Sequence, residues 1–210
     1  IRNPLASMSG SVQILRKTLE TSGEEAELLD IMLRESRRLD RIIGDFLLFA
    51  RPGRFRPGTA DLVPVLRESL TLLRNSEELG SACTIETAFE DVPVMARVDV
   101  NMIRQVFWNL ARNALKAMPA GGVLRVRAWN EGDGRVAISF ADQGVGMEES
   151  DITLAFQPFH GRFREGTGLG LSVVFRIVQE HGGRIQIRSR VGEGTEVMVS
   201  LPSAAASGEA

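Results

Sequence analysis

The sequence predicts an α+β protein in two parts: a helical hairpin that pairs with a second copy into a four-helix bundle, followed by an α/β sandwich. Over residues 1–51, apolar side chains recur at alternating steps of three and four, which is typical of bundle and coiled-coil helices. From about residue 61 onward, strand-like runs adjoin one another instead of alternating strictly with helices. That order favours a mixed or antiparallel sheet covered by helices on one face.

The hairpin is predicted from two apolar seams separated by a turn at Thr21-Ser22-Gly23. The first seam comprises Leu5, Met8, Val12, Leu15 and Leu19. The second comprises Leu29, Met32, Ser36, Leu39, Ile43, Phe46 and Ala50, with Leu28, Ile31, Ile42 and Leu47 widening it. Two helices alone cannot bury so wide a stripe, so we infer a homodimer. Packing of the hairpin against the rest of the same chain is the alternative.

The boundaries of the two parts follow from proline and glycine. Arg51-Pro52-Gly53 ends the second helix, so the hairpin is expected over residues 1–53, a linker over 54–60, the second domain over 61–202 and a disordered tail over 203–210. Within the second domain we expect helices near 61–75, 100–117 and 169–181, and strands near 83–89, 92–98, 122–130, 134–141, 183–190 and 195–201.

Composition excludes several classes of protein. A net charge of -2 over 210 residues gives no support for a partner bound through bulk positive charge, so we expect no nucleic acid. The single cysteine, Cys83, excludes an intrachain disulfide and a cysteine-rich zinc site. No apolar run approaches the roughly 20 residues of a membrane span. We therefore expect a cytoplasmic location. Because the sequence opens with Ile1-Arg2-Asn3-Pro4 and no initiator methionine, we expect a piece of a longer protein, with any membrane anchor outside this sequence.

Two asparagines mark the helix expected at 100–117. Asn109 and Asn113 are four residues apart and hence share a face. Asparagine is a poor helix former, and its amide oxygen suits Mg²⁺ that takes other ligands from nucleotide phosphates. Lys116, close to one turn further on, could meet phosphate as a point charge. Taken alone, the pair could equally satisfy buried backbone groups.

An acidic residue with two glycines ends the strand expected at 134–141. Asp142 could accept a hydrogen bond from an exocyclic amine such as that of adenine, while Gly144 and Gly146 let the backbone approach a flat ligand. By itself this pattern also suits an ordinary turn at a strand end.

A glycine-rich run opens the helix expected at 169–181. It comprises Gly166, Thr167, Gly168, Leu169, Gly170 and Leu171. Amide groups and the positive end of a helix dipole at such a start can hold an anion. No Gly-Lys-Ser/Thr follows, and no acidic residue stands where a dinucleotide fingerprint needs one. A flexible loop is the plain alternative.

The order of these motifs, rather than any one of them, resembles the ATP-binding domain of histidine kinases, part of a superfamily shared with gyrase. The asparagines, the Asp142 loop, Phe156-Gln157-Pro158-Phe159 and the glycine run match its N, G1, F and G2 boxes in sequence. Thr195, in Gly192-Glu193-Gly194-Thr195, also matches that superfamily near the adenine pocket. The resemblance covers about residues 61–202 and implies a Bergerat-type sandwich that binds ATP and Mg²⁺.

The hairpin is similar to the dimerisation and phosphotransfer hairpin of sensor kinases, in the branch of nitrogen-regulation and pilus-type kinases. Ile1-Arg2-Asn3-Pro4-Leu5 resembles the end of the box that carries the phosphoacceptor histidine. The resemblance places that histidine just before Ile1, and makes Asn3 a candidate for orienting water in dephosphorylation. His160 and His181 are not substitutes, because His160 lies in the expected lid and His181 precedes a glycine pair that ends a helix.

The resemblance implies a protein-histidine kinase that relays phosphate to an aspartate of a response-regulator receiver domain and also acts as a phosphatase, with a sensor domain upstream. Residues 147–167 would be a mobile lid, in which Arg162 or Arg164 takes the place of the usual phosphate-contacting lysine. Two rival readings remain: a clamp-type ATPase of the same superfamily, and a degenerate kinase that only dimerises and binds partners.

Overall fold

The computed structural model describes residues 10–12, 14–15, 24–50, 55–76, 78–160 and 168–204. These residues fall into two compact units, one made of the described residues up to 50 and one made of those from 55 onward. Each unit is described separately below. Within these ranges, no helix combines the length and apolarity needed to cross a bilayer.

The first unit contains a long helix, α2 (Glu24–Ala50), preceded by helical residues at 10–12 and 14–15. The helical character predicted from the seams is confirmed wherever the structure describes it. Val12, Leu33 and Ser36 are buried. Several apolar side chains are instead exposed, namely Ile14, Leu15, Leu28, Ile31, Met32 and Leu39. Leu5, Met8 and Leu19, the other members of the first seam, lie outside the described residues.

The second unit is built on a five-stranded mixed sheet. Its strands are β2 (Cys83–Phe89), β4 (Gly122–Gly132), β5 (Arg135–Asp142), β6 (Arg184–Arg190) and β7 (Gly194–Pro202), in the order β2-β4-β5-β7-β6. β2 runs parallel to β4, and the other neighbours are antiparallel. A separate antiparallel pair joins β1 (Gly58–Asp61) to β3 (Met95–Val98). The mixed sheet predicted from the element order is thereby confirmed.

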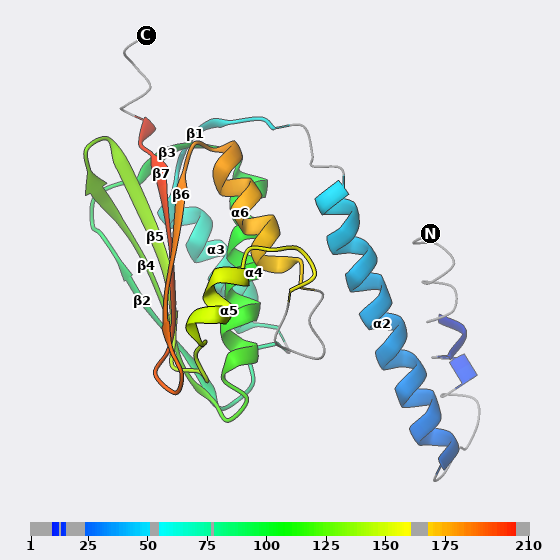
Figure 1. Ribbon diagram of the computed structural model, residues 1–210. Helices are drawn as coiled ribbons and strands as arrows, with labels where there is room; N and C mark the ends of the chain where they lie inside the picture. Colours follow the sequence, from blue (N-terminus) through cyan, green and yellow to red (C-terminus); the bar gives the residue numbers. More distant parts are fainter. Residues whose placement is uncertain are drawn as a thin grey trace. The chain divides into compact units, whose positions relative to one another are not determined.

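Three helices cover one face of this sheet: α3 (Leu62–Arg74), α4 (Val100–Ala117) and α6 (Gly170–Glu180), as Figure 1 shows. Aspartates start the first two. The Asp61 carboxylate accepts from the Val63 amide, and that of Asp99 accepts from the amides of Asn101 and Met102. The core between sheet and helices includes the fully buried Leu62, Leu66, Leu73, Ile103, Phe107, Leu124, Ile138 and Leu201.

Helix α6 ends as its glycines predict. His181 is the C-cap, and Gly182 follows at φ 64°, the left-handed conformation that favours glycine. The amides of Gly182 and Gly183 bond the carbonyls of Gln179 and Val178, which closes a Schellman motif. The buried imidazole accepts the Asp99 amide at Nε2 and contacts the Ile177 carbonyl through Nδ1. These contacts give His181 a structural position.

Two elements differ from the expectations. Gly58–Ala60, expected in the linker, form β1 together with Asp61, and the six-residue helix α5 (Glu149–Leu154) lies inside the expected lid. Neither segment has a local periodicity long enough to predict it; β1 exists because β3 pairs with it. At the other end, Ser203 forms an isolated bridge with Ala96 beyond the last strand.

Candidate functional site

One row of side chains crosses the end of the sheet beneath the helices. The strand register pairs Asp142 of β5 with Thr195 of β7, and Thr195 with Ser189 of β6. Directly paired residues point to the same face of a sheet. This row therefore places a carboxylate and two hydroxyl groups side by side, immediately next to the loop that follows Asp142.

The Asp142 carboxylate is held by the backbone. Its Oδ1 accepts from the Gly144 amide at 2.9 Å and the Thr195 amide at 3.2 Å. Burial raises the pKa of Asp142, and the two backbone hydrogen bonds partly oppose that rise. No described residue bonds to Oδ2. The site thus presents one carboxylate oxygen in a fixed direction, able to accept a hydrogen bond from an amine.

Gly144 and Gly146 allow other backbone segments to pack closely against the Asp142 loop. A Cβ on Gly144 would lie 2.5 Å from the Ala117 carbonyl oxygen at the end of α4, and the Val145 amide donates to that same oxygen at 3.0 Å. Gly146 has φ 63°, and a Cβ there would collide with the Arg190 carbonyl oxygen. We expected these glycines beside a flat ligand, and that role stays a prediction. In the structure their missing side chains make room for neighbouring backbone.

Gly146→Ala should therefore lower the free energy of unfolding by about 3 kcal/mol, because the change adds both backbone strain and a collision with the Arg190 carbonyl. Gly132→Ala is the matched control. Gly132 also has a positive φ, 89°, but nothing lies within 4 Å of the added carbon, so only about 1 kcal/mol should be lost. Urea unfolding would measure both. Equal losses for the two variants would contradict the tight contact at Gly146.

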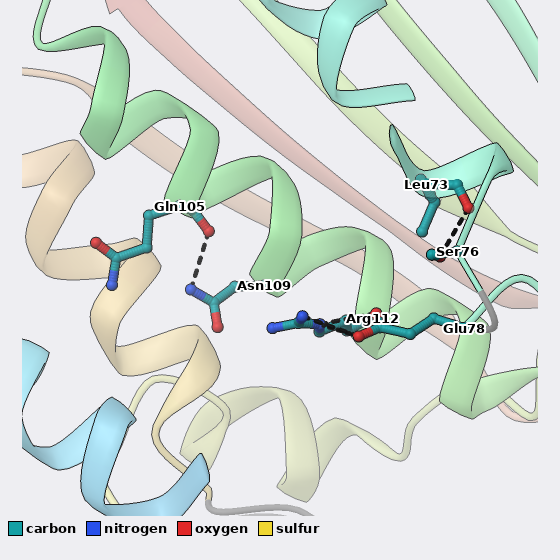
Figure 2. Close-up of polar contacts among 6 residues, drawn as sticks. All are labelled: Leu73, Ser76, Glu78, Gln105, Asn109 and Arg112. Carbon is teal, nitrogen blue, oxygen red and sulfur yellow. Dashed lines mark hydrogen bonds and ion pairs between the residues drawn. The ribbon is translucent and has the colours of Figure 1, made fainter. Parts of the chain in front are cut away.

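The two asparagines of α4 have different surroundings. Asn109 donates from Nδ2 to the Gln105 carbonyl at 3.0 Å, which leaves its Oδ1 pointing away from that bond (Figure 2). The half-buried Asn113 amide makes no hydrogen bond to any described residue. Arg112, between them in sequence, turns away: its guanidinium is paired with Glu78 at 2.8 Å and lies over the Trp108 ring. The asparagine face is therefore free of this cation.

The start of α6 lies against these asparagines. A Cβ on Gly170 would stand 3.2 Å from Asn109 Oδ1 and 3.7 Å from Asn113 Nδ2, so glycine keeps this space open. The N-cap residue, Leu169, offers no side chain to the first amides of the helix. Uncapped amides at a helix N-terminus attract anions. Gly168 precedes them at φ 68°, and its carbonyl accepts the Phe159 amide at 3.0 Å.

Helix α4 connects these groups. Asn109 and Asn113 face the start of α6, whereas Ala117, near the helix end, meets the Asp142 loop. Eight helical residues span about 12 Å. The structure thus places an amine-accepting carboxylate at one end of α4 and the side-chain amides of Asn109 and Asn113 beside the N-terminus of α6 further along. Such an arrangement can bind a nucleotide by its base and its phosphates at once.

The remaining predicted site residues are placed as follows. Lys116 is half-buried on α4, and Leu171 is half-buried in the first turn of α6. The Leu169 side chain is fully buried, so only its backbone can face a ligand. Asn3, Arg162, Arg164, Gly166 and Thr167 lie outside the described residues.

Comparison with known proteins decides the family. Residues 98–205 match the model described as histidine kinase-, DNA gyrase B-, and HSP90-like ATPase, and residues 1–54 match the His Kinase A (phospho-acceptor) domain. The sensor histidine kinase ZraS of Klebsiella oxytoca is 36% identical over 204 residues, 96% of this chain and 44% of that protein. The chain belongs to the sensor histidine kinase family. Sporulation kinase C of Bacillus subtilis is 34% identical over 203 residues, 96% of this chain and 46% of that protein.

The chain spans less than half the length of these curated relatives. Among solved structures, full-length ShkA in complex with AMPPNP superposes with a TM-score of 0.76 at 26% identity, over 97% of this chain and 44% of that one. ThkA in complex with the response regulator TrrA gives 0.73 at 23% identity, over 97% and 58%, and shows the fold alone. The nitrogen-regulation and pilus branch within the family stays a prediction.

Two contributors to the site were not predicted from the sequence. One is the Ala117 carbonyl, which no sequence motif could reveal because its role depends on where α4 ends. The other is Ser189, which occupies an inward position of β6 after Ile185 and Ile187. A serine in an alternating apolar series is the signal that could have found it.

Proposed function

We propose that this chain is the kinase core of a sensor histidine kinase. It binds ATP and Mg²⁺ and transfers the γ-phosphoryl group to a histidine of the hairpin. A response-regulator aspartate then receives the phosphoryl group, and the kinase also promotes its removal. The observation that carries the proposal is the joint arrangement of Asp142 and Thr195 at one end of α4 with Asn109, Asn113 and Gly170 further along it. Family membership supports this use of the arrangement.

The residues suit the parts of a nucleotide. The free Asp142 oxygen would accept the adenine amine, and Thr195 would lie beside it. Asn113, whose amide has no described partner, would offer Mg²⁺ a neutral oxygen ligand, and bound Mg²⁺ would neutralise phosphate charge. Gly168, Gly170 and the first amides of α6 would hold phosphate, with Lys116 contributing positive charge. Phosphoryl transfer needs mainly such positioning and charge neutralisation.

The hairpin is proposed to dimerise with a second copy. Leu28, Met32 and Leu39 are 59%, 50% and 46% exposed, and Ile31 is exposed beside them on α2. Their spacing of three, four and seven residues makes one apolar face. A second hairpin would bury this face in a four-helix bundle, which accords with the match to the phospho-acceptor domain.

The response-regulator partner is proposed by analogy, since ThkA has been solved in complex with the response regulator TrrA. The water-orienting role of Asn3 and the phosphate contacts of Arg162, Arg164, Gly166 and Thr167 remain proposals that rest on resemblance.

Calorimetric titration of this chain with ATP, with and without Mg²⁺, tests the nucleotide site. We expect binding that Mg²⁺ strengthens, and no comparable binding of a triphosphate without its base. The full-length kinase given γ-labelled ATP should then acquire an acid-labile, alkali-stable phosphoryl group on the hairpin. Absence of ATP binding to the folded chain would refute the nucleotide site. Binding without any labelling of the full-length protein would favour a degenerate kinase.

A further inference from the structure

Ser189 contacts three residues at the Asp142 end of the candidate site. Its Oγ lies 2.8 Å from the Met147 amide nitrogen, 2.9 Å from the Gly194 carbonyl oxygen and 2.8 Å from Thr195 Oγ1. Met147 follows the Asp142 loop, and Gly194 and Thr195 open β7. One hydroxyl group on β6 therefore holds both segments that border Asp142.

Counting hydrogens fixes the direction of each bond. The Met147 amide can only donate, so Ser189 Oγ accepts there. The Gly194 carbonyl can only accept, so it takes the single hydrogen of Ser189. Ser189 has no hydrogen left for Thr195. The Thr195 hydroxyl must therefore donate to Ser189, and its own oxygen retains only lone pairs.

This direction matters for the neighbouring carboxylate. Asp142 Oδ1 is already occupied by two backbone amides, and an ionised Oδ2 can only accept. With the Thr195 hydroxyl hydrogen turned toward Ser189, the side chains of Asp142 and Thr195 both offer acceptors and no donor. At the C6 substituent, such an edge fits an amine. It repels a purine with a carbonyl at C6, whose oxygen would face acceptor groups without a hydrogen between them.

We infer that Ser189 is a positioning residue for nucleobase selection: by fixing the Thr195 hydroxyl, it makes the base edge acceptor-only and favours 6-aminopurine over 6-oxopurine nucleotides. The inference rests on the proposed function, because it assigns Asp142 and Thr195 to the base. It goes beyond that function by giving a role to a residue that would not touch the nucleotide.

The experiment compares the dissociation constants of ATP and ITP, whose bases differ in the C6 substituent and in the hydrogen that hypoxanthine carries on N1, for the folded chain and three variants. Ser189→Ala frees the Thr195 hydroxyl to turn and donate, so the preference for ATP over ITP should fall about tenfold. Ser189→Thr retains a hydroxyl and should keep the preference. Ser139→Ala is the matched control, since the buried Ser139 hydroxyl on β5 has no hydrogen-bond partner among the described residues, and this variant should also keep the preference.

A double-mutant cycle with Thr195→Val completes the test. If Ser189 acts through the Thr195 hydroxyl, adding Ser189→Ala to Thr195→Val should leave the ATP-to-ITP ratio unchanged. Additive effects, or a Ser189→Ala variant that weakens ATP and ITP equally, would show a merely structural serine and overturn the inference. If the unaltered chain binds neither nucleotide, the proposed function fails and this inference fails with it. Binding of both without preference overturns the inference alone.

Discussion

Asp142→Asn should weaken ATP binding by about 100-fold while leaving the nucleotide-free chain at least as stable as before. Asparagine retains one side-chain oxygen. We expect it to take the place of Asp142 Oδ1, which accepts from the amides of Gly144 and Thr195. The group left for the base becomes an NH₂, which cannot accept from the adenine amine. The variant thus loses the charge-assisted hydrogen bond from the adenine amine to the carboxylate. In its place the amine of adenine faces the NH₂ of asparagine, and both groups are donors.

The free energy of unfolding should not fall in Asp142→Asn as the ATP affinity does, because burial raises the pKa of Asp142. A raised pKa means that the folded chain holds the proton more tightly than the unfolded chain does. The contribution of Asp142 to stability therefore falls as pH rises from the ordinary aspartate value to the raised one, and stays low above it. Asparagine carries no charge at any pH. The difference in unfolding free energy between variant and original should consequently grow across that window in favour of Asp142→Asn.

Calorimetry with ATP and urea unfolding over a pH series measure the two effects. Asp133→Asn is the matched control: Asp133 is an exposed residue at the turn between β4 and β5, with φ 47°, a conformation that asparagine tolerates. Asp133→Asn loses the same charge and should leave ATP binding unchanged. Unchanged ATP affinity in Asp142→Asn would refute the assignment of this carboxylate to the base.

The elements with long periodic patterns could be predicted from sequence, and the short ones could not. Helix α4 has many inward-facing apolar positions and an aspartate cap, so both its type and its extent were predictable. β1 has four residues and no apolar alternation, and it depends on β3 for all of its pairing. α5 has six residues and no buried side chain. Elements of this length are determined by tertiary contacts that local sequence does not contain.

The candidate site shows the same limit at the level of single residues. Each motif has an ordinary explanation when taken alone, and only the order of the motifs pointed to a nucleotide. Spatial relations supplied the rest: the register aligns Asp142, Thr195 and Ser189, and the packing of Gly170 on α4 brings the start of α6 to Asn109 and Asn113. Sequence alone could not show that Gly144 and Gly146 face neighbouring backbone, because that depends on where α4 and β6 end.

If Asn113 holds Mg²⁺ as proposed, Asn113→Ala should remove most of the gain in ATP affinity expected from Mg²⁺ and should lower phosphoryl transfer by the full-length kinase about 100-fold. Asn113 is half-buried beside Gly170 at the start of α6 and lies one turn before Ala117. Its amide oxygen has no competing partner among the described residues, so the side chain is available to an ion. Adenosine affinity should stay the same, because Asp142 and Thr195 remain in place.

The matched control for this prediction is Asn101→Ala, which removes an exposed asparagine side chain from the first turn of the same helix and should leave the response to Mg²⁺ intact. Asn113→Asp adds a second test, because a carboxylate would repel the triphosphate when Mg²⁺ is absent and attract the ion when it is present. The ratio of ATP affinities with and without Mg²⁺ should therefore rise in Asn113→Asp and fall in Asn113→Ala. If adenosine and ATP affinities dropped together in both variants, Asn113 would be supporting the shape of α4 rather than the phosphate end of the site.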